Sequence, residues 1–563
     1  MRTDKLFRRK ALDAPPPASG KGALHRSLGF RDLTALGIAA IIGAGIFSTI
    51  GQASADGGPG VALLFIFTGL ACGFSALCYA EFASAVPTAG SAYTYAYVTF
   101  GQLVAWIIGW GLILEYCVGN ITVAISWSDY FEGMLRGWGI HLPAWAGRDY
   151  LSTQAAVAAL NGQAPSDVLS QQALLAWQTA PQLPGGLRLI LDLPALVINV
   201  CITALVYVGI RESKVASNLL VVLKLGIIAL VLGVGVTLIR AENWVPFLPN
   251  GMGGVLKGVS GVFFAYIGFD AITTTTEECK NPARDMPRAI FASLILCTLL
   301  YVAIALVLTG MVPYHTLRVG DPLAFVFQNA DLAPDAKRIL VAVIAVSAVV
   351  AMTSVLLVFQ MGQPRIWMSM SRDGLLPERF GRIHPRFRTP AFATVLTGLG
   401  VGVPILFMDL ASSTDVTSIG TLFAFVLVCA GMLNLHLRPD YTFRYRAAGW
   451  CPPRVALGRW GLDVYPLLTS MAFYLLLRFP PENLQTAPHS LLDALERIPT
   501  LLVYGTLLYI GLRSLWRPQP LVPVLGLLSC LYLMAQVPAP SWGTFAIWML
   551  LGLGIYFAYG YRR

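Results

Sequence analysis

Long apolar stretches alternate with short polar and charged connections along the whole chain of 563 residues. A helix needs roughly 20 apolar residues to cross the hydrocarbon core of a bilayer, and stretches of about this length recur from end to end. The pattern predicts an all-α polytopic membrane protein with about 14 transmembrane helices. The helices are predicted near residues 31–51, 60–86, 99–127, 189–210, 215–239, 257–277, 288–312, 337–364, 390–408, 415–437, 462–478, 497–515, 519–536 and 541–560.

The first predicted helix is interrupted in its middle. Residues 38–47 (IAAIIGAGIF) are apolar enough for a bilayer, yet they contain Gly43 and Gly45, and each glycine costs a helix about 1 kcal/mol relative to alanine. Unpaired backbone at membrane depth is tolerated only where it lines a cavity or is buried in protein. An interruption here exposes N–H groups at the positive end of the second half-helix. Such discontinuous helices mark substrate sites in secondary transporters, although close packing through small residues is an open alternative.

A second interruption is predicted in the helix at 257–277, where Gly268 falls at mid-membrane and four threonines follow at 273–276. Hydroxyl groups can satisfy backbone groups that an interruption frees. Because the first and sixth helices are both interrupted, we expect two five-helix repeats of opposite topology. The expected divisions are a basic tail at 1–30, a first repeat at 31–240 that includes an outer loop at 141–188, a second repeat at 257–437, and four accessory helices at 462–560.

Composition and charge support a membrane protein with cytoplasmic ends. The chain is 56% hydrophobic and 12% charged, whereas a soluble domain is nearer a quarter charged. Most of the 39 Lys and Arg residues fall in connections that share a face with both termini, and the positive-inside bias assigns that face to the cytoplasm of a cell (inner) membrane. Anionic lipid headgroups account for the net charge of +10, so no nucleic acid partner is expected. The first 30 residues lack the apolar core of a signal peptide.

The sequence shows no constellation that is typical of an enzyme or a metalloprotein. The nine cysteines avoid the predicted outer loops, and no cluster of Cys, His and carboxylate residues with metal-ligand character is visible. No nucleophile with a neighbouring base stands out either. We therefore expect no cofactor, no metal, no catalytic residue and no obligate protein partner. The outer loop, with a short helix near 165–178, is interpreted as a solvent-exposed cap.

Three charged residues fall well inside predicted helices, namely Glu115, Lys224 and Asp270. Charges inside a membrane are rare and by default suggest function. A structural ion pair is the alternative for the two acids, since a buried charge needs a partner. Lys224 is a candidate proton carrier, because a buried lysine gives up its proton readily.

Short motifs along the chain resemble the amino acid–polyamine–organocation superfamily. They are IGAGIF at 42–47, YAEF at 79–82, VP at 86–87, GSAY at 90–93, FAYIGFD at 264–270, EE at 277–278, NP at 281–282, PRAI at 287–290, QPR at 363–365 and MSRDGLLP at 370–377. Within the superfamily, the number of predicted helices is similar to that of the cationic amino acid transporter family. The resemblance covers roughly residues 25–440 and includes these specific motifs, whereas the last four helices match in number only.

The resemblance implies a LeuT-like fold with a 5+5 inverted repeat and an amino acid substrate. It implies that the substrate α-carboxylate meets the interrupted backbone of the first helix, and that the α-amino group meets carbonyls of the sixth. The implied substrate-binding residues are Ile42, Gly43, Ala44, Gly45, Glu115, Phe264, Ala265, Ile267, Asp270 and Met352. Lys224 matches a lysine that takes the place of sodium in sodium-coupled relatives, which favours proton coupling or uniport.

The substrate side chain stays open at this stage. A cationic side chain would need a carboxylate such as Glu115 or Asp270, but either acid could instead pair with Lys224 and leave a neutral pocket. The bulk of Met352 favours a small neutral amino acid. The expected function is a proton-coupled, sodium-independent amino acid permease that works by alternating access. The alternative is an amino acid or polyamine exchanger, or a uniporter without proton coupling. Among functions other than transport, sensing of amino acids is the hypothesis most similar to these.

Overall fold

The computed structural model describes residues 6–9, 28–85, 91–160, 168–182, 184, 186, 188–209, 214–436, 448–453, 455–457, 460–462, 464–478 and 497–562. Most of the expected tail at 1–30, the motif at 86–87 and the connection at 437–447 lie outside this part of the chain. Helices make up nearly all of what is described. The one described strand pairing joins β1 (Val455–Leu457) and β2 (Trp460–Leu462) in a short antiparallel hairpin.

The helices follow one another in the order that the hydrophobic pattern predicts. In the first half they are α2 (Phe30–Ile41), α3 (Ile50–Gly57), α4 (Val61–Ala85), α5 (Ser91–Thr99), α6 (Gln102–Gly137), α7 (Tyr150–Ala159), α8 (Val168–Thr179), α9 (Leu193–Val208) and α10 (Lys214–Val236). In the second half they are α11 (Gly251–Lys257), α12 (Val259–Phe264), α13 (Pro282–Met311), α14 (Pro322–Gln328), α15 (Pro334–Arg372), α16 (Ala391–Ile405), α17 (Leu410–His436), α18 (Tyr465–Arg478), α21 (Ile498–Ser514), α22 (Leu521–Ala535) and α23 (Ala539–Ala558).

Short turns of tighter or wider helix connect these elements. They are η1 (Gly45–Thr49), η2 (Gly58–Gly60), η3 (Ala144–Ala146), η4 (Ala241–Trp244), η5 (Phe269–Glu278), η6 (Tyr314–Leu317), η7 (Glu378–Gly381) and η8 (Gly560–Arg562). Of these, η1 is a π-helix and η5 is a 3₁₀-helix. Asp192 caps the beginning of α9, because its carboxylate accepts from the Ala195 N–H at 3.0 Å. Gly209, with a left-handed φ of 82°, caps its end.

The chain is a multi-pass membrane protein. Within the described residues, seven helices are long and apolar enough to cross a bilayer, and a pair bent by 46°, Gly251–Lys257 with Val259–Thr273, makes an eighth. Three shorter apolar helices are Leu193–Val208, Ala391–Ile405 and Leu521–Ala535. Each of the 14 segments predicted as a transmembrane helix contains helix among the described residues. By length and composition, however, only seven or eight described helices qualify as membrane crossings. The pattern missed the short helices α5, α7 and α14.

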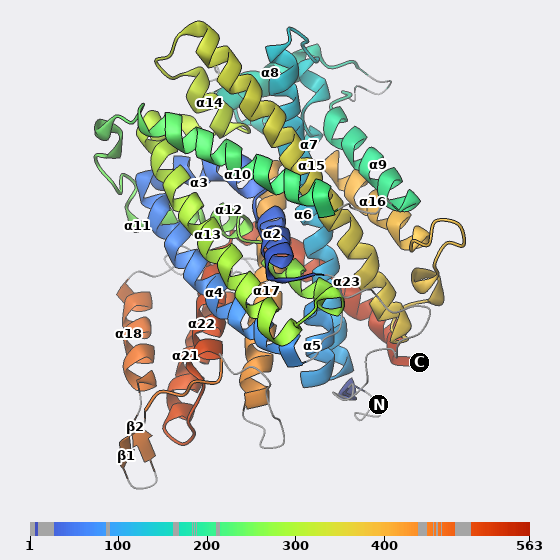
Figure 1. Cartoon of the computed structure of the whole chain (residues 1–563), viewed down its shortest axis with the longest axis vertical. Coiled ribbons are helices and arrows are strands. Elements are labelled where there is room, and N and C mark those ends of the chain that lie inside the picture. Colours follow the sequence, from blue (N-terminus) through green and yellow to red (C-terminus); the bar gives the residue numbers. More distant parts are fainter. Residues whose placement is uncertain are drawn as a thin grey trace.

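Helix α6 forms the centre of the bundle. It packs against α15, α17, α5, α16 and α9. In its most apolar stretch of 18 residues, 94% is buried inside the protein, whereas the corresponding share for α10 is 33%. A helix that is apolar all round is expected in the middle of a bundle. Figure 1 shows α7, α8 and α14 at one end of the bundle and both chain ends at the other.

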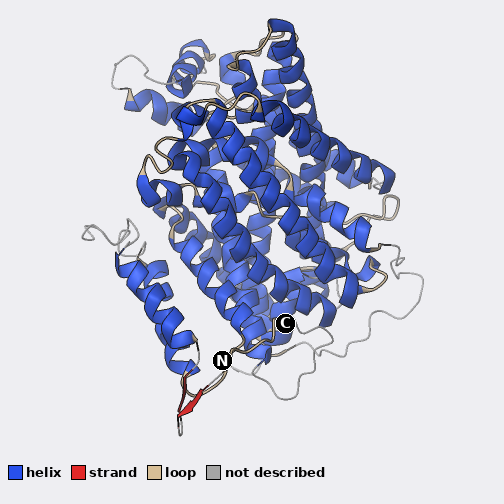
Figure 2. Ribbon diagram, turned by 60° about the vertical axis from the view of Figure 1, so that its left-hand side comes forward, coloured by secondary structure: helices blue, strands red, loops and turns tan. Residues whose placement is uncertain are grey.

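The C-terminal helices attach to this core unequally. Helix α22 packs against α17 and α4, and α23 packs against α17 and α6. Helix α18 packs against α21, and Figure 2 shows α18 beside the main bundle, next to the red hairpin. The accessory group therefore joins the core through α22 and α23.

Two tryptophans hold α23 on α6. The indole N–H of Trp110 donates to the Trp548 carbonyl at 2.8 Å, and that of Trp548 donates to the Trp110 carbonyl at 3.0 Å. Their rings stack with centroids 4.7 Å apart. Gly552 leaves room for the Trp110 ring, because a Cβ there would lie 2.3 Å from Trp110 Cδ1. Buried indoles that find hydrogen-bond partners in this way make strong contacts between helices.

We expect Trp548→Leu to lower the midpoint of thermal unfolding, because it removes a stacked ring pair and an indole N–H bond, each worth about 1 kcal/mol. Trp542→Leu on the same helix is the matched control, since no indole hydrogen bond of Trp542 is seen. Thermal unfolding of both purified variants measures the difference. An equal loss in the two variants would contradict a special role for the Trp110–Trp548 pair.

Candidate functional site

The chain leaves helical geometry where the sequence predicts the first interruption. Helix α2 ends at Ile41, Ile42 is extended with φ −76° and ψ 98°, and the chain resumes as η1 at Gly45. The Gly43 carbonyl accepts from the N–H groups of Ile46 and Phe47 at 3.2 and 3.3 Å, which closes a tight turn. N–H groups at such a helix start have no acceptor within the helix.

The second interruption separates α12 from η5. Helix α12 ends at Phe264, whose carbonyl accepts from the Ile267 N–H at 3.1 Å. Gly268 has a φ of 117°, which only glycine adopts without strain, and η5 starts directly after it. The sequence therefore located this interruption correctly.

The two interruptions lie against each other, and each uses a glycine for the close approach. A Cβ on Gly45 would lie 2.3 Å from the Ala265 Cα, and a Cβ on Gly268 would lie 2.8 Å from the Ala40 carbonyl oxygen. Real Cβ atoms do not approach other atoms this closely. The pairing brings Gly43, Gly45 and Ala265, which were assigned from separate stretches of sequence, into one place.

Two side chains from other helices engage the carbonyls that α2 leaves at its end. The Lys224 amine of α10 donates to the carbonyls of Ala39 and Ile42 at 2.7 and 2.8 Å. The Tyr301 hydroxyl of α13 lies 2.9 Å from the Ile41 carbonyl and 2.8 Å from the Ala265 carbonyl. A helix C-terminus carries partial negative charge and stabilises a cation. Lys224, which is 1% exposed, is placed where an ammonium group gains most from the backbone.

The two acids that the sequence predicts inside the membrane, Glu115 and Asp270, interact with each other. Glu115 on α6 and Asp270 in η5 are buried, their charges interact, and Thr421 of α17 bonds to the Glu115 carboxylate. Each carboxylate keeps one buried oxygen without a hydrogen-bond partner. Such oxygens can accept a proton or a donor group from a ligand.

Met352 lies on the face of α15 that meets the first interruption. It is fully buried and precedes Val355 by three residues, a spacing that puts both side chains on one face of a helix. Val355 contacts the first interruption, since a Cβ on Gly43 would lie 3.0 Å from its side chain. Helical spacing thus assigns Met352 to the face of α15 that carries Val355.

Sequence reasoning missed two residues of this site. Besides Tyr301, it missed Thr49, whose hydroxyl lies 3.0 Å from the Gly45 carbonyl and 2.8 Å from the Gly261 carbonyl and so joins η1 to α12. The one available signal for Tyr301 was that a tyrosine deep in an apolar helix needs a hydrogen-bond partner.

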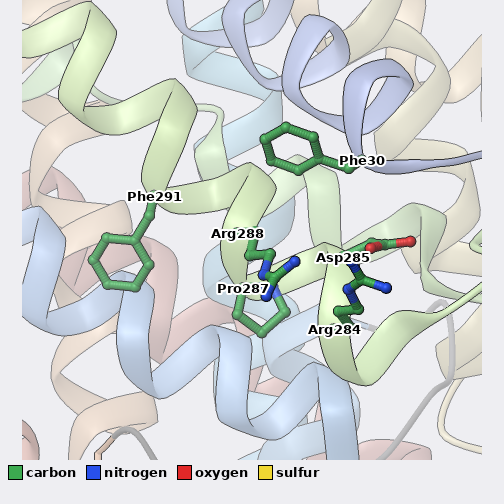
Figure 3. Close-up of a pocket in the computed structure, with 6 residues that line it drawn as sticks. All are labelled: Phe30, Arg284, Asp285, Pro287, Arg288 and Phe291. Carbon is green, nitrogen blue, oxygen red and sulfur yellow. The ribbon is translucent and has the colours of Figure 1, made fainter.

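A surface pocket lies away from these interruptions. Figure 3 shows it at the beginning of α13, where its lining contains charged side chains. Its lining residues are Phe30, Arg284, Asp285, Pro287, Arg288 and Phe291. None of the predicted site residues lines it. Within the part of the chain that the structure describes, no group of three or more His, Cys, Asp or Glu residues is arranged to hold a metal ion.

Comparisons with known proteins match this chain over almost its whole length. The model of the amino acid permease family matches residues 28–492, and the model of the C-terminus of such permeases matches residues 519–563. A methylthioribose transporter of Bacillus subtilis is 36% identical over 99% of this chain and 98% of its own length. A branched-chain amino acid permease of the same organism is 39% identical over 79% of this chain and 88% of its own. A vacuolar cationic amino acid transporter of Arabidopsis thaliana is 31% identical over 99% of this chain and 93% of its own.

We expect Gly45→Ala to separate the two interruptions and to lower the midpoint of thermal unfolding, because its Cβ would overlap the Ala265 backbone. Gly233→Ala is the matched control: nothing lies within 4 Å of its Cβ, and alanine gains about 1 kcal/mol of helix propensity over glycine. Thermal unfolding of purified variants measures both. Equal stability of Gly45→Ala and the parent protein would show that the interruptions do not need their close approach.

Proposed function

Because the chain belongs to the amino acid permease family, we propose that it carries an amino acid across the cell (inner) membrane by alternating access, coupled to protons and independent of sodium. Family membership confirms the resemblance of its motifs to the amino acid–polyamine–organocation superfamily and to the cationic amino acid transporters within it. It also confirms the expectation of a transporter rather than an enzyme. The substrate, the coupling ion and the site are the subject of the proposal.

The proposed architecture is a LeuT-like fold of 14 transmembrane helices with cytoplasmic ends. The first repeat spans 31–240, the inverted repeat spans 257–437, the accessory helices span 462–560, and lipids surround the bundle. Two features support the division. The interruptions fall in the first and sixth predicted helices, and both chain ends lie at the end of the bundle opposite the outer loop helices α7 and α8 (Figure 1).

In the proposed site, the substrate carboxylate binds the N–H groups of Gly43, Ala44 and Gly45, beside Ile42. The positive end of the half-helix that starts there supports an anion. The substrate ammonium binds the carbonyls of Phe264, Ala265 and Ile267. Phe264 and Ala265 each face one donor in the structure, and a carbonyl oxygen has a second lone pair for a ligand. Opposite partial charges at the two interruptions thus suit a zwitterion.

The observation that carries proton coupling is the pair of hydrogen bonds from Lys224 to the Ala39 and Ile42 carbonyls. A protonated amine draws these carbonyls together, much as a bound sodium ion would. A neutral amine attracts them far less, since charged hydrogen bonds are roughly twice as strong as neutral ones. Losing the proton therefore frees the end of α2 next to the proposed substrate carboxylate, which links proton release to movement of the helix.

We propose a small neutral amino acid as the substrate. Met352 fills space on the face of α15 that meets Gly43, and a bulky side chain there leaves little room for a long substrate. Glu115 and Asp270 lie close to each other, so a proton that they share can balance part of their charge without a cationic substrate. The relatives named above carry methylthioribose, branched-chain and cationic amino acids in their names, so side-chain choice varies among them.

We expect Lys224→Ala to abolish concentrative uptake driven by an inward pH gradient while part of the counterflow exchange survives, because exchange needs no net proton movement. Proteoliposomes with and without an imposed pH gradient, and with and without sodium, provide the measurement. Lys224→Arg is the second variant. It keeps a charge that does not dissociate, so it too is expected to lose the response to pH.

Half-buried Lys337→Ala, at the beginning of α15, is the control for this experiment and is expected to behave like the parent protein. Strict dependence on sodium, or concentrative uptake by Lys224→Ala, would contradict proton coupling through this lysine. Equal rates of counterflow and gradient-driven uptake in the parent protein, at every pH, would favour the exchanger or uniporter instead.

We expect Met352→Ser to widen the accepted substrates towards longer side chains, including arginine and lysine, by about tenfold in relative affinity, which corresponds to about 1.4 kcal/mol. Met361→Ser is the matched control, because nine residues along a helix place it on the opposite face of α15. Competition of each amino acid against a labelled substrate measures the change. Identical competition profiles for Met352→Ser and the parent protein would show that Met352 does not line the pocket.

A further inference from the structure

A short segment between α13 and α15 covers one end of the first interrupted helix. This segment, which we call the lid, comprises η6 and α14, residues 314–328. Helix α14 packs against η1 and α15, and η6 packs against α3. Leu323 and Phe327 of the lid are fully buried. Figure 1 shows α14 at the end of the bundle opposite the two chain ends.

The neighbouring end of α6 engages the lid, η1 and α9 through consecutive side chains. The Ser128 hydroxyl donates to the Asp192 carboxylate at the start of α9 at 2.6 Å. The Tyr130 hydroxyl donates to the Phe47 carbonyl of η1 at 2.6 Å and also interacts with the Leu323 backbone N–H of the lid. This part of α6 is therefore the point where the lid and the interrupted helix are joined.

Between these two residues, acids of α6 and of the lid face one another. Asp129 lies against Gly320, where a Cβ would lie 2.2 Å from its Oδ2, and Asp321 lies against Gly133, where a Cβ would lie 3.2 Å from its Oδ2. Each acid thus packs on a glycine of the other's segment, and their charges interact. The reciprocal packing places two half-buried carboxylates at the contact between the two segments.

Other charged groups face the same junction. Glu132 packs against Gly147 of the outer loop, where a Cβ would lie 1.6 Å from its Oε1, and this oxygen is buried without a hydrogen-bond partner. Asp192, which caps α9, is a further acid whose charge interacts with those of Asp129 and Glu132. The cations that face these acids are Arg136 of α6 and Arg148 of the outer loop, while Arg318 of the connection between η6 and α14 pairs with Asp56. Acids outnumber the cations that face them.

We propose that Asp129, Glu132 and Asp321 form a proton-operated latch, which closes the lid over the interrupted helices when these acids bind protons and releases it when they ionise. Like charges held close in a poorly solvated junction repel each other strongly. Protonation removes the repulsion and lets the two segments stay packed. The latch rests on the proposed function only in assuming that the interrupted helices hold the substrate.

The direction of the pH response follows from Asp321. Burial, together with the negative charge of Asp129, raises the pKa of the Asp321 carboxyl to about 7 with the lid closed, against about 3.9 for a solvated aspartate. A closed lid thus binds the proton more tightly than an open one. By linkage, closure becomes more favourable as pH falls from about 7 towards about 3.9, and this contribution is lost once pH has risen through about 7. An acidic outer medium would therefore close the lid over a bound substrate.

The latch is tested by the accessibility of a cysteine placed under the lid. Leu323→Cys puts a thiol at a fully buried position of α14, and His315→Cys puts one at an exposed position of the same segment. Both are made in a chain in which the exposed Cys201 and Cys451 are replaced by serine. Proteoliposomes are labelled from outside with an impermeant maleimide at pH 5.5 to 8.5, without substrate. The ratio of the two labelling rates cancels the pH dependence of the thiol itself.

We expect this ratio to rise at least threefold from pH 5.5 to pH 8.5 in the parent chain. With Asp129→Asn and Asp321→Asn together it should stay at the low-pH value throughout, because the amides mimic protonated acids. Exposed Asp331→Asn and Asp335→Asn on the same side are matched controls that should keep the parent response. Glu132→Gln is a second variant that should move the midpoint to lower pH, since it removes a neighbouring negative charge.

A ratio that does not change with pH in the parent chain would overturn the latch, as would an asparagine pair that responds like the parent. If the asparagine pair does not fold, an unchanged midpoint in Glu132→Gln would overturn it as well. Labelling needs neither substrate nor flux. A failure of proton-driven uptake would therefore refute the proposed function and leave this measurement intact, and the reverse also holds.

Discussion

The close contact between two interrupted helices is the constraint on which the rest of this structure depends. At membrane depth every backbone group that an interruption frees needs a partner or must be buried in protein. Here the two interruptions pack against each other and so bury part of their freed backbone. Gly45 lies against Ala265 and Gly268 lies against Ala40, at distances that exclude any side chain. Tyr301 then contacts one carbonyl from each interruption. The surrounding helices are arranged so that α10, α13 and α15 all reach this one point.

Much of this arrangement could be predicted from the sequence because its causes are local. An apolar run of sufficient length predicts a helix, and a glycine pair within such a run predicts an interruption, whatever the rest of the chain does. The long helices and the first interruption followed from these rules, and the second interruption followed from the single Gly268 with the threonines after it. Helix α14 did not, since seven residues are too few for a periodic signal. Membrane crossing by each of the shorter helices stays a prediction.

The partners of the site could not be predicted in the same way, because they depend on contacts between distant residues. Nothing near Tyr301 indicates that its hydroxyl reaches carbonyls 36 and 260 residues away. The sequence likewise left open whether Glu115 or Asp270 pairs with Lys224. In the structure the acids interact with each other, and the lysine donates to the backbone of α2. The sequence identifies the charged residues inside the membrane, but it does not show which of them interact with each other.

Helix α6 is continuous, whereas the two helices of the proposed site are interrupted. It carries Glu115 at its middle and two acids of the latch, Asp129 and Glu132, at one end, and it binds α23 through Trp110. Its burial on all sides and its unbroken hydrogen bonding make it stiff, whereas α2 and α12 each end at an interruption. We therefore expect motion at the interruptions. The charged groups proposed to control it, Lys224 and the latch acids, lie where the interrupted helices or the lid contact continuous helices. In the two proposals, a proton on Lys224 of α10 acts at the end of α2, and a proton on Asp321 acts at the lid. The proposed pH responses therefore arise at two separate places next to the first interrupted helix and require no change in α6.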